Sequence, residues 1–144
     1  MGRGAQGTNA WLETLTNQTG GKEALKNVLR EYFMVCHRMS DFILLIYQET
    51  RSLPDQWQTR VLENELRITN LFVDVLDGFV KSGDLPPLDR QEIDLAAHNI
   101  SVLGHMWTFR RWYFGRHYSI EDYIRLQTGF ILNMCSGSQK DADP

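Results

Sequence analysis

The chain contains few cysteines: Cys36 and Cys135 are the only two among its 144 residues. A chain of this length buries roughly 68–70% of the surface that its unfolded form exposes, so it needs neither a disulfide nor a metal for stability. Two thiols without a local partner indicate a reducing compartment, in which both act as small buried apolar side chains. Because the N-terminus lacks the apolar core of a signal peptide, we expect a cytoplasmic protein.

Long apolar runs and a strong net charge are also missing. The longest apolar run, Phe42 to Tyr47, is far too short to span a bilayer, so we expect no membrane segment. The formal net charge is −3, and the 15 lysines and arginines are scattered along the chain. This distribution argues against a nucleic-acid groove on this chain.

Motifs that carry catalysis or hold metals and cofactors are absent. No H-E-x-x-H, G-x-S-x-G, P-loop or G-x-G-x-x-G occurs. His98 and His105 lie two helical turns apart, about 10 Å, which is too far for one shared metal ion. Cys36 and His37 are adjacent and would point about 100° apart on a helix, which is a poor nucleophile–base pair. We therefore expect no enzyme activity, no bound metal and no cofactor.

What the sequence does contain is helical periodicity. Apolar residues recur at spacings of three and four, whereas alternating strand patterns and hairpin turns are absent. These features predict an all-α fold, an irregular antiparallel bundle of about six helices. The expected helices cover residues 9–20, 22–38, 42–50, 55–82, 89–116 and 119–134.

The helix over residues 42–50 is nearly all apolar, so we expect it to be deeply buried. Asp89-x-x-Glu92 is a capping-box pattern that opens the next-to-last helix. We expect residues 1–8 to be a disordered leader, residues 9–135 to form one helical domain and residues 136–144 to be a flexible tail.

The helix expected from Asp89 to Arg116 has two apolar faces. At 100° per residue, one face gathers Ile93, Ala96, Ala97, Ile100, Leu103, Gly104 and Trp107. The opposite face gathers Leu95, His98, Val102, His105, Met106, Phe109 and Tyr113. One face must cover the core of the domain, and the other must cover a second chain, a ligand cavity or both.

An aromatic block lies near the end of this helix, interleaved with arginines: Trp107, Phe109, Arg110, Arg111, Trp112, Tyr113 and Phe114. Base stacking on nucleic acid does not suit the acidic balance of the chain. Core packing with arginine–aromatic contacts is the default interpretation. A hydrophobic ligand pocket is the sharper alternative, with His98, His105 and Met106 as adaptable lining groups.

Four segments in order resemble the C-terminal ligand-binding and dimerisation domain of TetR-family transcriptional regulators. They are Tyr47-Gln-Glu-Thr-Arg-Ser-Leu-Pro54, Lys81-Ser-Gly-Asp-Leu85, Trp107-Thr-Phe-Arg-Arg-Trp-Tyr113 and Tyr118-Ser-Ile-Glu-Asp-Tyr-Ile124. The resemblance covers roughly residues 22–135. It implies a homodimer in which the last two helices pair with the same two helices of a second copy.

The resemblance also implies a ligand cavity among the middle helices. A small hydrophobic effector, acyl-CoA-like or fatty-acid-like, would change the spacing of two DNA-binding heads and relieve repression. The helix-turn-helix that begins members of this family has no counterpart here. We expect that it was removed, with residues 1–7 as an expression leader, rather than that the protein naturally lacks it. This chain alone should therefore not bind DNA.

The resemblance leads to an assignment of the two apolar faces. The dimer interface is expected to use Ala96, Ala97, Ile100, Gly104, Trp107, Tyr123, Gln127, Phe130 and Met134, because small residues allow helices to approach closely. The cavity is expected to use His98, Val102, His105, Met106 and Phe109, with Phe33, His37, Tyr47 and Phe72. The sequence leaves open whether the two faces are exchanged.

A different interpretation is a stand-alone helical dimerisation and interaction module with a filled core and no ligand. A ligand domain needs a void of roughly 300–1,000 Å³, whereas a scaffold packs to ordinary interior density. The presence of a cavity therefore distinguishes the two interpretations.

Overall fold

The computed structural model describes residues 21–141, with side chains through Ser136, and this part of the chain is all-α. It contains six α-helices, one short 3-10 turn and no strand, so the predicted fold class is confirmed. The elements are α2 (Gly21–Arg38), α3 (Ser40–Glu49), η1 (Thr50–Ser52), α4 (Asp55–Lys81), α5 (Arg90–Phe109), α6 (Arg111–His117) and α7 (Ile120–Asp141). The helix expected over residues 9–20 and the leader over residues 1–8 lie outside the described residues, and α7 continues beyond its expected end at Met134.

Local sequence signals set the helix boundaries. Helix α4 begins directly after Pro54, and the chain turns away after α4 at Gly83, whose φ of 84° suits a residue without a side chain. The capping box that opens α5 is formed: the Asp89 carboxylate accepts from the Glu92 N–H at 2.8 Å, and the Glu92 carboxylate accepts from the Asp89 N–H at 3.0 Å. The hydroxyl of Ser119 likewise accepts from the Asp122 N–H at 3.0 Å and starts α7.

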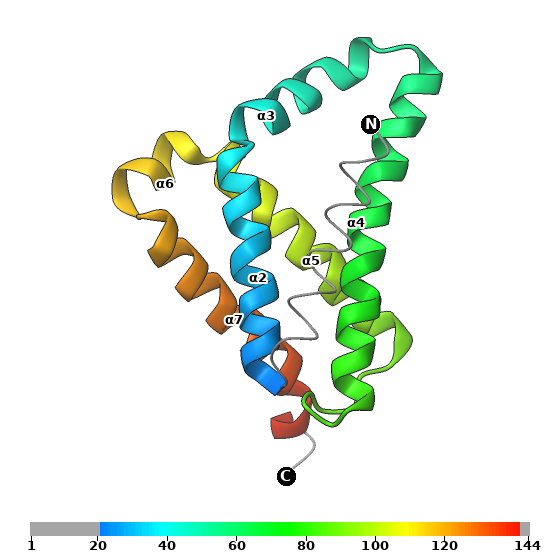
Figure 1. Cartoon of the computed structure of the whole chain (residues 1–144), viewed down its shortest axis with the longest axis vertical. Coiled ribbons are helices and arrows are strands. Elements are labelled where there is room, and N and C mark those ends of the chain that lie inside the picture. Colours follow the sequence, from blue (N-terminus) through cyan, green and yellow to red (C-terminus); the bar gives the residue numbers. More distant parts are fainter. Residues whose placement is uncertain (1–20, 142–144) are drawn as a thin grey trace.

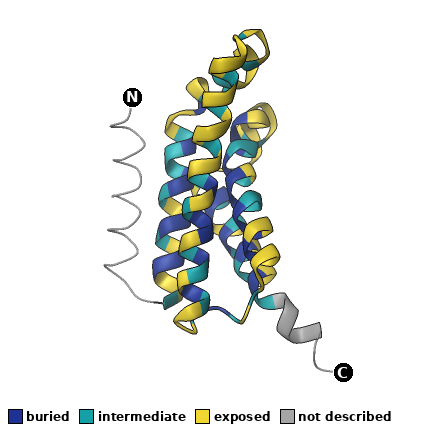
Figure 2. Ribbon diagram, turned by 90° about the vertical axis from the view of Figure 1, so that its right-hand side faces the viewer, coloured by how far each residue is buried: buried dark blue, intermediate teal, exposed yellow. Residues whose placement is uncertain are grey.

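Helix α5 lies at the centre of the bundle and packs against α2, α3, α4 and α7. Figure 1 shows α4 on one side of the bundle and α7 on the other, with α2 and α5 between them. The largest fully buried side chains come from these four helices: Leu25, Leu29, Phe33, Phe72, Leu76, Ile100 and Ile131. Figure 2 shows that buried residues gather in the lower and middle parts of the bundle, whereas the end that carries α3 and η1 is mostly exposed.

The prediction of one continuous helix from Asp89 to Arg116 is wrong. Helix α5 ends at Phe109, and Arg110 leaves the helical conformation with φ −112° and ψ 22° before α6 begins. The break turns Phe114 back toward the bundle, where its ring stacks on Trp107 at 6.3 Å and contacts Tyr123 at 5.4 Å between centroids. Aromatic burial therefore outweighs the helical continuity that the sequence suggests.

The prediction that residues 42–50 are deeply buried is also wrong. Ser40 is the one buried residue of α3, and Phe42 and Leu45 are each 53% exposed. Helix α3 extends past the end of the core, so only part of its surface faces other helices (Figure 2). Ile43 and Ile46 lie on that inner part.

Helices α2 and α5 approach each other most closely at Gly104. A Cβ atom at this position would lie 2.5 Å from Cε2 of Tyr32 and 2.8 Å from Sγ of Cys36. Tyr32 cannot move aside easily, because it is buried and its hydroxyl donates to the carbonyl oxygen of Ser101 at 2.9 Å. Glycine is therefore required here by space rather than by backbone conformation.

We predict that Gly104→Ala lowers the free energy of unfolding by about 1–3 kcal/mol, because the added methyl group overpacks the contact with Tyr32 and Cys36. Gly129→Ala in α7 is the matched control, since no atom lies within 4 Å of its added Cβ. The control should stabilise the helix by about 0.5–1 kcal/mol through helix propensity alone. Urea denaturation of both variants measures the difference, and equal stability of the two would contradict the close approach.

Candidate ligand-binding site

A cavity of about 620 Å³ lies between α2, α3, η1, α4 and α5, toward the exposed end of the bundle. This volume is in the range of small-molecule sites in proteins. Most of its wall is apolar and comes from three helices and the junction between two of them: Val35 of α2, Met39 between α2 and α3, Phe42, Ile43 and Ile46 of α3, and Trp57, Val61 and Ile68 of α4. The cavity exists because α3 diverges from the core and leaves the apolar face of α4 uncovered there.

The polar centre of the wall is the pair Tyr47 and His105. The Tyr47 hydroxyl lies 3.1 Å from Nδ1 of His105, and the two rings meet edge to face with centroids 5.6 Å apart. If the hydroxyl donates to Nδ1, Nε2 carries the ring proton of His105; if the hydroxyl donates to Glu65, the Nδ1–H of His105 donates to the hydroxyl oxygen. Phe109, one turn beyond His105 on α5, also meets the Tyr47 ring edge to face, with centroids 4.6 Å apart.

Burial and a nearby carboxylate both shift the pKa values of this pair, in opposite directions for His105 and in the same direction for Tyr47. Burial lowers the pKa of His105 below its ordinary value of 6.5, while the negative charge of Glu65 acts to raise it. Burial and the Glu65 carboxylate both raise the pKa of Tyr47. At neutral pH the pair is therefore uncharged, and it can donate or accept hydrogen bonds without bringing an ionic charge into the cavity.

The inner end of the cavity is closed by Tyr32 and Cys36 of α2 and by Ser101 of α5. Burial raises the pKa of the Cys36 thiol to about 12, and burial also raises the pKa of Tyr32. Both groups are protonated at neutral pH. A thiol in this state is a poor nucleophile, so this wall offers packing and a weak donor rather than reactivity.

The structure brings together only part of the predicted pocket. Tyr47 and His105 line the cavity, and Phe109 supports Tyr47 from outside the lining. The other predicted pocket residues do not line it: Phe33, His37, Phe72, His98, Val102 and Met106.

These six residues have other surroundings. Phe33 and Phe72 belong to the core, and His37 accepts a hydrogen bond from Nε1 of Trp107 at 3.0 Å. Val102 is 60% exposed on the outer surface of α5, about 60° around the helix from His105. Most of the cavity wall comes from α3 and α4, from which the sequence predicted only Tyr47 and Phe72 as pocket residues. Glu65, a charged residue within the apolar stripe of α4, is the signal that could have identified this wall.

Five residues that were predicted for the dimer interface are buried inside the chain. Ala96, Ala97, Ile100, Gly104 and Trp107 form the face of α5 that is covered by the chain's own core, with Gly104 against α2. They cannot contact a second copy in this fold, because their small side chains have already allowed the close approach of a helix from the same chain.

The residues that were predicted for the interface on α7 are divided. Tyr123 is buried and donates a hydrogen bond to the carbonyl oxygen of Leu103, and Gln127 is half-buried. Phe130 is 66% exposed, and Met134 is exposed as well. The exposed part of this set faces away from the core, where another molecule could cover it.

An apolar surface spans the outer sides of α5 and α7. We call it the α5–α7 surface, and its exposed members are Leu95, Val102, Leu126, Phe130 and Met134. The two helices join at this surface, since Nδ2 of Asn99 lies 3.5 Å from Sδ of Met134. Large exposed apolar side chains that gather on one surface mark interaction sites.

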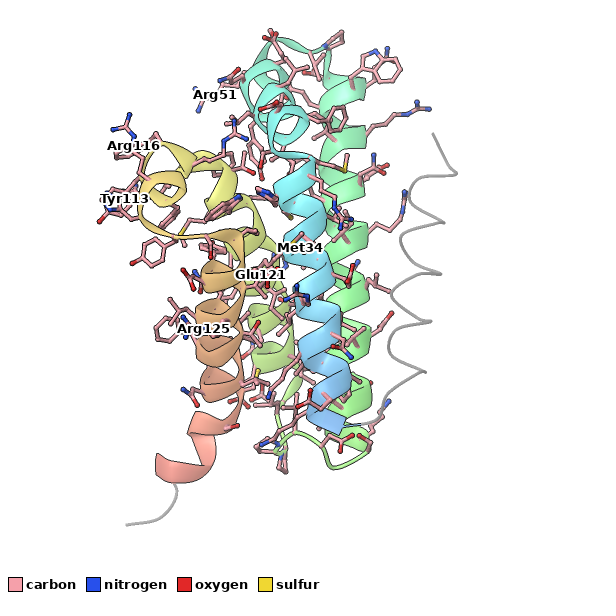
Figure 3. All side chains as sticks on the ribbon, turned by 60° about the vertical axis from the view of Figure 1, so that its left-hand side comes forward. Met34, Arg51, Tyr113, Arg116, Glu121 and Arg125 are labelled. Atoms are coloured by element: carbon pink, nitrogen blue, oxygen red, sulfur yellow. The ribbon has the colours of Figure 1, made fainter. Side chains whose placement is uncertain are left out.

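The aromatic block divides at Arg110. Trp107 lies in the core, whereas Trp112 is exposed and has the Arg110 guanidinium 5.3 Å from its ring centroid. Tyr113 and Arg116 project from α6 away from the other helices (Figure 3). The same view shows Glu121 on α7 near α2, where its carboxylate accepts two hydrogen bonds from Arg30 at 2.6 and 2.7 Å and links the helices.

In the part of the chain that the structure describes, no three His, Cys, Asp or Glu side chains gather in a way that could hold a metal ion. Within the same residues, no helix is long and apolar enough to cross a membrane.

Comparison with known proteins gives one match. The family described as "Tetracyclin repressor-like, C-terminal domain" matches residues 18–135 of the chain. No curated protein and no solved structure matches it. The match covers the whole of the cavity wall and most of the described helices.

We predict that Glu65→Gln lowers the pKa of His105 further below 6.5, because it removes the negative charge that favours the imidazolium form. NMR titration of the imidazole ring protons measures this pKa, and His105→Asn identifies the resonance. The control is Glu63→Gln, which removes an exposed carboxylate from the same helix and should leave the pKa unchanged. An unchanged pKa in Glu65→Gln would mean that the carboxylate does not act on the ring.

Proposed function

Because this chain belongs to the family of tetracyclin repressor-like C-terminal domains, we propose that it is the effector-binding and dimerisation domain of a transcriptional regulator. The regulator acts as a repressor that a small, mainly apolar molecule inactivates. Contact with DNA belongs to a separate helix-turn-helix segment, whose pattern this sequence does not contain. The domain itself performs no chemistry on the molecule that it binds.

The cavity is the observation that carries this proposal. A void of about 620 Å³ with apolar walls and one neutral polar pair suits a small amphipathic ligand. A scaffold module that binds no ligand would gain stability by filling such a space, since interiors otherwise pack like organic crystals. The cavity therefore supports a sensor rather than a purely structural module.

Dimerisation is assigned to the α5–α7 surface. The pairing uses the outer face of α5 rather than the face that the sequence interpretation preferred. Two copies related by a two-fold axis would bury Val102 and Phe130 against the same residues of the partner. Four helices, two from each copy, would then form one seam.

Helix α5 connects the two functions. His105 faces the cavity, while Val102, three residues earlier, faces the α5–α7 surface. Because a helix moves as a nearly rigid body, a ligand that displaces the wall at His105 also moves the dimer seam. In the proposed regulator this motion changes the distance between the two DNA-binding heads.

We predict that Val61→Trp weakens the binding of octan-1-ol at least about tenfold, because the larger side chain fills the cavity. Burial of an eight-carbon chain favours binding, with a Kd on the order of 0.1 mM for the unmodified domain. Isothermal titration calorimetry measures the Kd of octan-1-ol for the unmodified domain and for Val61→Trp. Leu62→Trp, at the neighbouring and 56% exposed position, is the control and should bind as the unmodified domain does. Equal binding by Val61→Trp would place the alcohol elsewhere.

We predict that Val102→Glu raises the dissociation constant of the dimer at least about tenfold, because it buries an unpaired charge in the seam. Sedimentation equilibrium measures the constant. Leu62→Glu introduces the same charge on α4, away from the seam, and should leave the constant unchanged. A dimer that is equally stable in both variants would exclude the α5–α7 surface as the interface.

A further inference from the structure

We infer that Glu65 binds a positively charged group of the effector, so that the ligand is an amphipathic amine rather than a fatty acid or an acyl-CoA. This inference rests on the proposed effector-binding function and specifies the chemistry of its ligand. It follows from the position of Glu65, from the partners of the surrounding charges and from the composition of the cavity wall.

Glu65 occupies a position in α4 at which the spacing of the apolar residues predicts an apolar side chain. Trp57, Val61, Ile68 and Phe72 follow the inner face of this helix at steps of four, seven and four residues, and Glu65 lies between the second and third of them. Its side chain is half-buried and lines the cavity. A carboxylate in such a place loses part of its hydration, which a cationic partner would compensate.

Among the side chains that the structure describes, no cation supplies that compensation. Among the ion pairs formed by the described side chains, none includes Glu65. Its polar neighbours in the cavity are Tyr47 and His105, which bond to each other and are neutral at neutral pH. A carboxylate has about four lone-pair sites, so contact with one hydroxyl leaves most of its accepting capacity unused.

The two arginines that line the cavity have other partners. The Arg60 guanidinium lies 5.1 Å from the centroid of the Trp57 ring, and Nη1 of Arg67 donates to Oδ1 of Asn64 at 2.9 Å. Both side chains are exposed, so they lie at the rim, where water screens their charge. The inner charge of the cavity is therefore negative, and a ligand cation complements it.

The wall around Glu65 suits an amine with an apolar body. The rings of Trp57 and Tyr47 line the same cavity, and aromatic faces attract cations. An ammonium group placed at Glu65 would donate charge-assisted hydrogen bonds to the carboxylate, which are about twice as strong as neutral ones. The apolar remainder of the ligand would contact Ile43, Ile46 and Val61.

The test compares three ligands with one eight-carbon chain and different head groups: octylamine, octan-1-ol and octanoate. Isothermal titration calorimetry at pH 7 with the full chain measures each Kd. We expect octylamine to bind about tenfold more tightly than octan-1-ol, and octanoate to bind most weakly. Glu65→Gln should abolish the preference for the amine while keeping the affinity for the alcohol. Glu63→Gln, which removes a rim carboxylate of the cavity, is the matched control and should retain the preference.

Other results would contradict the role of Glu65, the positive charge of the effector or the effector site itself. Equal affinity for the three ligands, or a preference for the amine that survives Glu65→Gln, would overturn the role of Glu65 and leave the cavity as the effector site. Tighter binding of octanoate, lost in Arg60→Gln, would instead assign an anionic effector to the rim arginines. Failure of all three ligands to bind would contradict the effector site itself.

Discussion

The close approach of α2 and α5 at Gly104 is the constraint on which the rest of the structure depends. It allows α5 to lie at the centre of the bundle, in contact with α2, α3, α4, α6 and α7. The angular positions of all its residues are then set. The small residues Ala97 and Gly104 face inward, His105 lies at the edge of the cavity, and Val102 points outward. One steric requirement thus determines which residues are available for ligand and which for a partner.

The cavity and the outer surface are therefore two consequences of one arrangement. If α5 were packed less tightly, a bound ligand would displace only the residues near the cavity, and the outer surface of α5 would not move. Because the contact with Tyr32 leaves no free space, the proposed sensor would share a movement at His105 along the whole of α5. Tight packing on one face of α5 would then let a ligand on the neighbouring face act on the outer surface.

Sequence patterns predicted the fold class and most helix boundaries, because capping residues such as Asp89 and breakers such as Pro54 act locally. The break at Arg110 could not be predicted, since it results from the contact of Phe114 with distant rings. The face of α5 that was predicted to pair with a second copy is instead buried within the chain, for a related reason. Small residues such as Ala97 permit a close helix, but the sequence does not tell whether that helix belongs to the same chain. The pair Tyr47 and His105 was identified, whereas Glu65 became meaningful only when α3 and α4 were seen to share a cavity.

The position of helix α3 has a consequence for how the proposed sensor would respond to a ligand. It contributes little to the core, and most of its surface is in contact with water or with the cavity (Figure 2). Elements of this kind open at a lower free energy than the global transition, so α3 can separate from α4 without unfolding the bundle. In the proposed sensor, a ligand at one hundred times its Kd would stabilise the state in which α3 is packed by about 2.7 kcal/mol. Occupancy of the cavity would then increase order at the end of the bundle.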